Sequence, residues 1–343
     1  MKHVGGETLN RKLRIVLLCI LVVSFFSLNL SSCTHKDLTK VRLNEVTHSI
    51  FYAPQYAAIS QGFFKEEGLD IELTNGGGAD KVMTALLSGQ SDIGFMGPES
   101  TLYVYNQDKE DYAINFAQLT KRDGSFLLAR KANPDFSWES VKGSHIIAGR
   151  KGGVPEMTLE YVIRKHGMIP NQDVKCDTTI QFNLMAGAFS GGTGEYVALF
   201  EPTASMLEKE NKGFIVASIG KDSGELPYTV YSAKKSYIEK NKDIVQRFTN
   251  AIYKGQIWVD KSSYEEIAKA IKPFFLDTDD EMLVTVIKRY KDQDTWSKDP
   301  MLKPEALDLL QKIMSDAGEL TKKVPYDKIV TTKFAEEAVK KVK

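Results

Sequence analysis

Short apolar runs alternate with stretches of helical periodicity over the first two thirds of the chain, from about residue 41 to residue 218. In the helical stretches, apolar side chains recur three or four residues apart, as at Tyr56, Ile59 and Phe63. This order is typical of parallel sheets covered by helices, because each helix returns the chain to the same edge of its sheet. We predict strands at residues 43–47, 70–74, 92–96, 114–119, 126–130, 145–148, 174–178, 197–201 and 214–219.

The pattern changes after Ser236, where strand signals fade and helical periodicity dominates. Apolar residues follow a helical spacing at 245–259 and again at 283–290. About one hundred residues of helix are unstable alone beside a sheet domain, so we expect this C-terminal third to pack back on the first lobe.

Two segments, residues 120–124 (TKRDG) and 220–224 (GKDSG), interrupt strand-like runs with charges and glycine. They have the character of hinge crossings between two lobes, although two ordinary surface turns are the alternative. As crossings, they predict an α/β protein in which each lobe has a central sheet flanked by helices. Lobe 1 would then comprise residues 41–122 and 225–343, and lobe 2 residues 123–224.

The N-terminus has the features of an export signal. Arg11, Lys12 and Arg14 precede an apolar run at 15–26, and Leu-Ser-Ser-Cys follows, ending at Cys33. The run is shorter than the roughly 20 apolar residues of a spanning helix, and the small serines suit cleavage and lipidation at Cys33. We therefore predict a lipoprotein signal peptide at 1–32, a tether at 33–40 and a lipid-anchored protein on the outer face of the cell membrane. An uncleaved membrane anchor is the alternative.

Composition excludes several other classes of protein. The chain has 343 residues, with 45 Lys+Arg against 45 Asp+Glu, which gives no attraction to nucleic acid. Beyond the leader and Cys33, Cys176 is the one remaining cysteine, and the five histidines are isolated in the sequence. These counts predict no disulfide framework, no metal site and no cofactor. His48, at the end of the first predicted strand, either touches a ligand or has a structural role.

Candidate binding residues lie where strands end and helices begin, because open parallel sheets bind ligands beyond the carboxyl ends of their strands. Five such junctions occur, at residues 49–55, 75–80, 97–100, 150–156 and 201–203. Glycines there would let a ligand approach backbone N–H groups at a helix start. The sequences GxxxxGK[ST] and GxGxxG are absent from these junctions, so a nucleotide-phosphate loop is not predicted.

Three of these stretches carry a family resemblance: FYAPQYAAISQGFFKEEGLDIEL from Phe51, GGGADKVMTALLSGQSDIGFMGPES from Gly76 and FEPTASMLE from Phe200. With the lipoprotein leader, they resemble the SsuA/THI5-like (NMT1/THI5-like) substrate-binding lipoproteins of ABC importers, which take up sulfonates, nitrate, thiamine pyrimidine precursors and similar molecules. The resemblance implies a type II periplasmic-binding-protein fold, two lobes that close on a small ligand, a monomer, and a permease with its ATPase as partners.

Carried over by motif onto the junctions of this sequence, the resemblance implies ligand-binding roles for Phe51, Tyr52, Gln55, Gly77, Gly78, Gly97, Glu99, Gly152, Gly153 and Glu201. We also predict ligand-binding roles for Thr120, at the first crossing, and Tyr228, just after the second. Phe51 and Tyr52 have packing on the following helix as an alternative role. For Glu99 and Glu201, the alternative role is an interaction with a helix dipole.

Glu99 and Glu201, if both face the cleft, disfavour an anion and suit a neutral or cationic nitrogen heterocycle, such as a thiamine-pyrimidine-like molecule. Arg122, Arg150 and Lys151 weigh toward a sulfonate or nitrate ligand. The same family includes a pyrimidine synthase of THI5 type, which carries a cysteine-rich motif. This chain lacks a cysteine cluster and a GxSxG elbow, so we expect a binding protein and not an enzyme.

Overall fold

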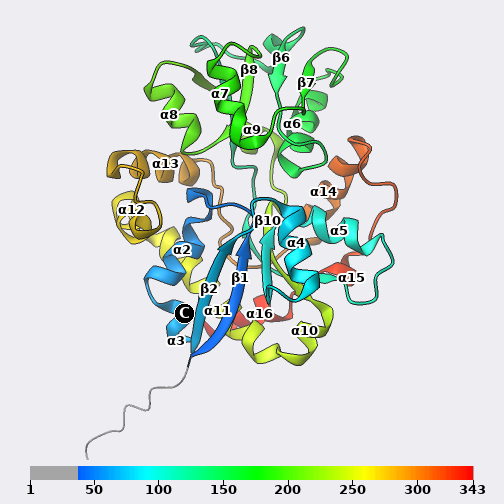
Figure 1. Ribbon diagram of the computed structural model, residues 1–343, viewed down its shortest axis with the longest axis vertical. Helices are drawn as coiled ribbons and strands as arrows, with labels where there is room; N and C mark the ends of the chain where they lie inside the picture. The colour runs from blue at the N-terminus through cyan, green and yellow to red at the C-terminus, as the bar shows by residue number, and fades with distance from the viewer. Residues whose placement is uncertain (1–37, 343) are drawn as a thin grey trace, which may run out of the picture. The chain divides into compact units, whose positions relative to one another are not determined.

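Two five-stranded mixed sheets organise the protein, one in each lobe (Figure 1). The computed structural model describes residues 38–342, and within them no helix is long and apolar enough to span a membrane. The lobe 1 sheet has the order β2-β1-β3-β10-β4, with β10 antiparallel to both its neighbours. Its strands are β1 (Thr39–Glu45), β2 (Leu69–Asn75), β3 (Ile93–Met96), β4 (Ala113–Thr120) and β10 (Thr229–Lys234).

The lobe 2 sheet has the order β7-β6-β8-β5-β9, with β5 antiparallel to β8 and β9. Its strands are β5 (Ser125–Ala129), β6 (His145–Ile147), β7 (Lys175–Asp177), β8 (Tyr196–Phe200) and β9 (Phe214–Ser218). Both sheets confirm the predicted α/β architecture, and each predicted strand overlaps an observed one. The first strand begins earlier than predicted, at Thr39, because all seven of its residues pair with β2.

Helices cover the faces of both sheets. Those that pack on the lobe 1 sheet before the first crossing are α2 (Ala53–Ser60), α3 (Phe63–Glu66), α4 (Ala79–Ser88) and α5 (Glu99–Tyr105). Lobe 2 carries α6 (Val154–Lys165), α7 (Met185–Ser190), α8 (Thr203–Lys209) and α9 (Ile219–Ser223). Short 3₁₀ turns are η1 (Ile50–Tyr52), η2 (Trp138–Val141), η3 (Phe182–Leu184) and η4 (Lys272–Phe274).

The C-terminal third is helical, as predicted, and returns to lobe 1. Its helices are α10 (Lys235–Lys240), α11 (Lys242–Lys261), α12 (Tyr264–Ile271), α13 (Asp280–Asp292), α14 (Pro304–Asp316), α15 (Tyr326–Ile329) and α16 (Lys333–Lys341). The apolar face of α11, including Val245, Phe248 and Ile252, is fully buried against α2 and α16. Helices α13 and α14 also contact α8 and α6 of lobe 2, so this third of the chain braces both lobes.

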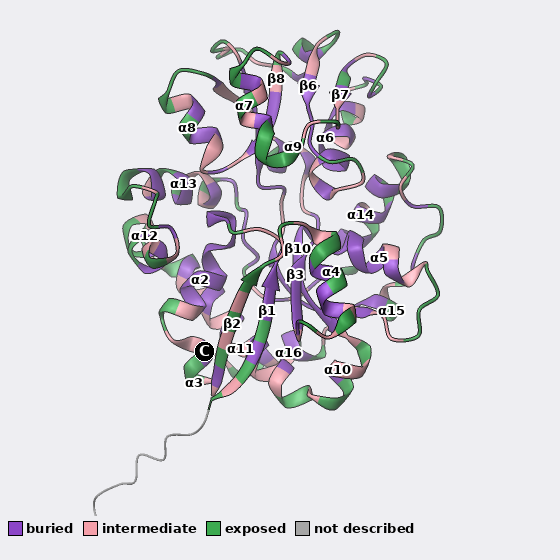
Figure 2. Cartoon of the chain, viewed as in Figure 1, coloured by how far each residue is buried: buried purple, intermediate pink, exposed green. Residues whose placement is uncertain are grey.

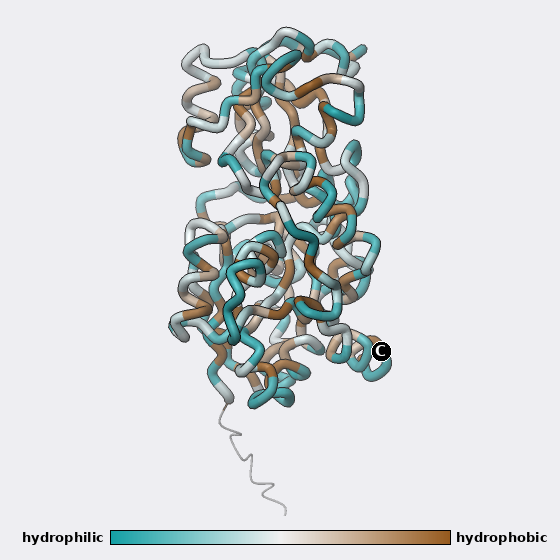
Figure 3. Tube along the Cα trace, turned by 90° about the vertical axis from the view of Figure 1, so that its right-hand side faces the viewer, coloured by the Kyte–Doolittle hydropathy of each residue, from teal (hydrophilic) through white to brown (hydrophobic). Residues whose placement is uncertain are grey.

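Burial follows the layers of the fold. All four residues of β3 are buried, as expected of a strand covered on both faces, whereas the outer helices bury one face (Figure 2). In Figure 3, hydrophilic and hydrophobic residues alternate along the outer helices, which matches their one-sided burial. Cys176 on β7 is free and buried, and burial raises the pKa of its thiol to about 12.

The chain passes between the sheets at residues 121–124 and 224–228, and these two segments lie side by side. The Leu226 N–H donates to the Lys121 carbonyl at 3.0 Å, and the Tyr228 N–H donates to the Thr120 carbonyl at 3.1 Å. The second segment lies later than the sequence predicted, because residues 219–223 form helix α9 packed on lobe 2. The predicted lobe bounds remain a prediction, and the signal peptide, Cys33 and most of the tether lie outside the described residues.

Candidate ligand-binding site

Aromatic side chains fill the interface between the lobes. Phe51 lies on η1, which follows β1 after the loop 46–49, and Ser49 Oγ accepts a 3.2 Å hydrogen bond from its N–H. The Phe51 ring lies 5.6 Å from Phe200 of lobe 2 and 5.6 Å from Tyr228 on the second crossing, measured between centroids. A Cβ at Gly124 would come within 2.5 Å of this ring, so only glycine lets the first crossing pass so close. Phe51 is therefore the side chain on which both crossings and both lobes meet.

Tyr52 extends the same aromatic group toward the lobe 1 sheet. Its ring meets Phe95 of β3 edge-on, with 4.6 Å between centroids. Burial raises the pKa of its phenol well above the ordinary value, and the Glu45 and Glu99 carboxylates add to the shift. Both predicted aromatic residues are thus buried at the lobe interface, where their packing role and a ligand-contact role are compatible.

Glu99 starts helix α5 just after β3, and its carboxyl group curls back over Gly97. Any Cβ at Gly97 would overlap this carboxyl group, which explains why glycine precedes it. Glu99 is buried, and its Oε2 has no hydrogen-bond partner within residues 38–342. Burial raises the pKa of Glu99 to about 7, although the N–H groups of Glu99 and Ser100 oppose the shift. The predicted interaction with the helix start exists, yet it leaves one oxygen unused.

Asp123 is a polar residue of the interface that the sequence analysis placed in a crossing but did not select. Its Oδ1 accepts hydrogen bonds from Ser125 N–H at 2.7 Å and Ser125 Oγ at 2.5 Å. Its Oδ2 and the Tyr228 hydroxyl are both buried without a hydrogen-bond partner in the described part of the chain. Burial raises the pKa of Asp123 to about 7. The signal available in the sequence was a charged residue inside a short crossing, because burying a charge there costs free energy unless the charge has a partner.

The basic residues near the interface have acidic partners. Arg150 Nη1 lies 3.2 Å from Asp80 Oδ1 across the two lobes, and Arg122 Nη2 lies 3.6 Å from Asp294. One atom of Arg122, Nε, is buried without a partner among the residues described. Lys151 is exposed. Each of these cations therefore has an acidic partner or lies in solvent, and the atoms left over are one donor, Arg122 Nε, and two carboxyl oxygens, of Glu99 and Asp123.

Glu201 differs from Glu99 although both follow a strand. Its Oε1 is 2.6 Å from Arg289 Nη1 and its two oxygens accept 2.8 Å hydrogen bonds from Ser205 Oγ and Ser205 N–H. Because these donors come from α8 and from α13, the Glu201 carboxylate joins the lobes and has little capacity left for a ligand. In this structure the Glu201 carboxylate is therefore engaged by protein donors, and its role as a ligand-binding residue stays a prediction.

Gln55 and Thr120 also have protein partners. Gln55 donates to Glu45 Oε2 at 2.8 Å and accepts from the Tyr231 hydroxyl at 3.0 Å. Thr120 Oγ1 lies 2.6 Å from Thr229 Oγ1 on the neighbouring strand. Both side chains are buried in hydrogen-bond networks of the lobe 1 sheet, so in this structure they stabilise the lobe 1 side of the interface through protein contacts.

The glycine loops meet across the lobes but surround protein side chains. Gly78 has a φ of 149°, and a Cβ there would press on Asp80 Oδ1 and on Arg150 Nη1, at 2.7 and 3.3 Å. The nearest neighbour of Gly77 in the same test is Lys81 Nζ at 3.9 Å. These two glycines therefore shape the loop that presents Asp80 to lobe 2.

The second pair of predicted glycines lies opposite, on lobe 2. The Gly152 carbonyl accepts a 3.0 Å hydrogen bond from the Tyr103 hydroxyl of α5, and its N–H donates to Glu156 Oε2 at 3.2 Å. Gly153 precedes α6 in extended conformation. Together with the Asp80 contact, these bonds close the interface on this side.

His48 has a structural place. Its Nδ1 lies 2.9 Å from Glu45 Oε1 and its Nε2 lies 2.8 Å from the Phe274 carbonyl oxygen. The Glu45 hydrogen bond is the main reason that the pKa of His48 is raised. The side chain thus ties the end of β1 to η4, which fits the structural one of the two roles that its position in the sequence allowed.

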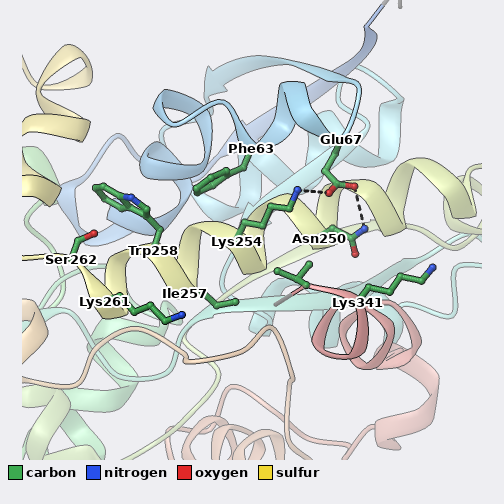
Figure 4. Close-up of a pocket in the computed structure, with 10 residues that line it drawn as sticks. Phe63, Glu67, Asn250, Lys254, Ile257, Trp258, Lys261, Ser262 and Lys341 are labelled. Carbon is green, nitrogen blue, oxygen red and sulfur yellow. Dashed lines mark hydrogen bonds and ion pairs between the residues drawn. The ribbon is translucent and has the colours of Figure 1, made fainter.

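A separate pocket of about 490 Å³ lies on lobe 1 along α11, with Phe63, Trp258 and Ile257 among its lining residues (Figure 4). None of the predicted binding residues lines it. Its polar side chains bond to each other, since Lys254 Nζ lies 2.7 Å from Glu67 and Asn250 donates to Glu67 at 3.2 Å. We therefore place the candidate site at the lobe interface and not in this pocket.

Comparison with known proteins identifies the family of this chain. Residues 50–262 match the family model described as NMT1/THI5 like. YtlA of Bacillus subtilis (strain 168), whose name proposes a binding protein and states no ligand, is 49% identical over 329 residues, which are 96% of this chain and 98% of that protein. The 4-amino-5-hydroxymethyl-2-methylpyrimidine phosphate synthase of Aspergillus parasiticus is 24% identical over 219 residues, 61% of this chain and 63% of that protein.

A solved structure extends the comparison to the fold. The alkanesulfonate-binding protein SsuA from Xanthomonas axonopodis pv. citri, bound to MOPS, superposes with a TM-score of 0.69 and covers 86% of this chain and 99% of its own. Its sequence identity is 14%, so the likeness concerns the fold alone. By the family model and by its half-identical relative, the chain belongs to the NMT1/THI5-like family and has the fold of the solute-binding proteins that serve ABC-type importers.

Proposed function

We propose that this protein is the extracytoplasmic solute-binding component of an ABC importer. It captures a small molecule between its lobes and delivers it to a permease driven by an ATPase. The family, the two sheets and the paired crossings support this role, because two lobes joined by a hinge can enclose and release a ligand. Lipid on Cys33 would hold the protein at the outer face of the cell membrane.

The favoured ligand is a small nitrogen heterocycle of the thiamine-pyrimidine type. The observation that carries this proposal is the unpartnered Oε2 of Glu99, buried beside the aromatic residues of the interface. A buried acceptor without a partner costs free energy, which a ligand N–H group would recover. Phe51 or Tyr52 would supply the flat apolar surface on which such a ring stacks.

A sulfonate or nitrate ligand is the second candidate, because a solved relative is an alkanesulfonate-binding protein with MOPS bound. An anion needs free donors or cations, whereas Arg150 is paired with Asp80 and Arg289 with Glu201, and Arg122, which pairs with Asp294, leaves only its Nε free. Glu99 beside such a ligand would repel it once ionised. The balance of charges therefore favours the heterocycle.

The family also contains a synthase, which is the enzymatic alternative. Within residues 38–342, Cys176 is the one cysteine, and its buried thiol is a poor nucleophile and metal ligand because its pKa is about 12. Incubation of the purified protein with precursors of 4-amino-5-hydroxymethyl-2-methylpyrimidine phosphate should give no turnover. Formation of this pyrimidine phosphate would show that the protein is an enzyme.

The decisive experiment compares two probes by calorimetry: 4-amino-5-hydroxymethyl-2-methylpyrimidine and butanesulfonate. Glu99→Gln should weaken pyrimidine binding by about 10- to 100-fold, because it replaces a charge-assisted hydrogen bond by a neutral one. Glu110→Gln, at an exposed glutamate of the same lobe, is the matched control. Butanesulfonate binding that becomes tighter in Glu99→Gln would instead assign an anionic ligand.

A further inference from the structure

The hinge of this protein contains polar atoms that no part of the proposed function has used. Asp123 lies in the first crossing and Tyr228 in the second, and their side chains are 0% and 6% exposed. The two side chains are close enough for each to shift the pKa of the other as a hydrogen-bonding neighbour, yet Asp123 Oδ2 and Tyr228 Oη make no hydrogen bond of ordinary geometry within the described range, 38–342. Two neighbouring buried atoms left without partners require an explanation, since such groups are rare in folded proteins.

The carboxyl group of Asp123 is held in a fixed orientation. Its Oδ1 accepts two hydrogen bonds from Ser125, and its backbone carbonyl accepts a 2.6 Å hydrogen bond from Gln293 Nε2. Gly220 passes directly beneath that carbonyl, and a Cβ at this position would overlap it. These contacts fix the position of Asp123 and none of them involves Oδ2, which is the arrangement of a preorganised acceptor.

Tyr228 is fixed in the same way on the other crossing. Its N–H donates to the Thr120 carbonyl at 3.1 Å, and its ring packs edge-on against Phe51. The pKa of its hydroxyl is raised well above the ordinary value, first by burial and then by the charge of the Asp123 carboxylate, while Tyr52, the hydrogen-bonding neighbourhood of Asp123 and Glu99 add smaller effects. Asp123, Glu99 and Tyr228 thus lie within electrostatic reach of one another.

The charges around this group point to a positively charged partner. Arg122, the cation of the same crossing, extends to Asp294 and to the Gly220 carbonyl. Arg289 extends to Glu201 and Glu208. Two buried carboxyl groups consequently share the interface with cations that already have acidic partners, an arrangement that a protonated nitrogen would stabilise.

We propose that the hinge carries a second ligand subsite, in which Asp123 Oδ2 and the Tyr228 hydroxyl bind a protonated nitrogen, an ammonium or amidinium group, of the captured solute. The inference rests on the proposed function, because a subsite at this interface needs a solute enclosed there. It narrows the solute to a molecule with two polar ends, one donating to Glu99 and one cationic group at the hinge. Occupancy would join the two crossings through the ligand, which couples binding to the hinge.

The test uses three probes that share one ring and differ in charge: benzamidinium, benzamide and benzenesulfonate. Calorimetry on the full mature protein should show that benzamidinium binds at least about tenfold more tightly than benzamide. Asp123→Asn keeps the acceptor that Ser125 needs and turns Oδ2 into a donor, so it should weaken benzamidinium by about 10- to 100-fold. Tyr228→Phe removes one hydroxyl and should weaken it by about 5- to 10-fold.

Asp294→Asn is the matched control, because it makes the same change of charge beside the hinge, on a residue that pairs with Lys121 and Arg122. Its affinities should equal those of the unaltered protein. The same four proteins are compared by native mass spectrometry for the solute they carry from the cell. Thermal unfolding confirms that each variant is folded, and Tyr228→Phe provides a second measurement if Asp123→Asn is unstable.

The outcomes distinguish the hinge subsite from the solute-binding function on which it rests. Loss of benzamidinium and of the carried solute in Asp123→Asn and Tyr228→Phe, but not in Asp294→Asn, supports the hinge subsite. A solute carried equally by all four proteins overturns the subsite and leaves the solute-binding function intact. Benzenesulfonate binding that tightens in Asp123→Asn overturns the cationic class. Absence of any bound solute or probe in the unaltered protein overturns the proposed function itself.

Discussion

Replacing Glu99 by glutamine should change how the stability of the ligand-free protein depends on pH. Gln keeps the shape of the side chain but cannot ionise. In the native protein burial raises the pKa of Glu99 from 4.5 to about 7. Because the folded-state pKa is raised, the contribution of Glu99 to the free energy of unfolding is fully present below the ordinary pKa and is lost as the pH rises through about 7. Ionisation in the folded state is therefore the destabilising event that the variant removes.

The size of the effect follows from the shift. Each unit of pKa corresponds to about 1.4 kcal/mol, so the loss of unfolding free energy between strongly acidic solution and about pH 8 is about 3 kcal/mol. About 2.5 kcal/mol of this falls between about pH 5 and pH 8. Asp123 and Glu156 are also buried carboxyl groups with pKa values of about 7, but they titrate in both proteins and cancel in the comparison.

Urea unfolding at pH 5, 6, 7 and 8 measures the effect. The Glu99→Gln protein should gain about 2.5 kcal/mol relative to the unaltered protein between the lowest and the highest pH. Glu110→Gln, at an exposed site, should show the unaltered profile. Parallel profiles for Glu99→Gln and the unaltered protein would refute the argument that Glu99 is buried without a compensating partner.

Three further predictions concern the lobes and the anchor. Arg289→Met leaves the Glu201 carboxylate buried without its cation, so urea unfolding should show a loss of about 3 kcal/mol, and an unchanged stability would mean that this ion pair does not brace the lobes. Cys33→Ala should release a folded protein from the membrane fraction, whereas a variant of mature mass that stays membrane-bound would exclude lipid as the anchor. Saturation with the solute carried from the cell should reduce the radius of gyration in small-angle scattering, because two crossings permit hinge closure, and a constant radius would indicate a rigid interface.

Much of the architecture could be predicted from local pattern. Buried strands such as β3 are continuous apolar runs, and the apolar spacing of α11 and α13 has the period of a helix, so each can be recognised from a few neighbouring residues. The early start of β1 was missed, since the polar residues Lys40 and Arg42 alternate with Val41 and only pairing with β2 defines the strand. The late second crossing was missed because α9 has only five residues, too few to show a period.

The site was predicted less completely, because the availability of a polar atom depends on distant residues. Glu99 and Glu201 both follow a strand and adjoin a proline, yet Arg289, 88 residues further on, binds one of them and no described cation binds the other. His48 likewise owes its role to the Phe274 carbonyl, 226 residues away. Periodicity reports which face of an element is buried, but it carries no information about which partner arrives there.

By itself, therefore, the sequence determined the two α/β lobes, the first crossing, the helical C-terminal third and the stretches that identify the family. These follow from short-range spacing, which hydrophobic burial converts directly into strands and helices. The tertiary structure alone decided that Asp123, Glu99 and Tyr228 meet at the lobe interface with acceptor atoms to spare, while Glu201 is neutralised. Such pairing is set by contacts between residues remote in sequence, and a buried polar group gains or loses its function according to whether one of those contacts satisfies it.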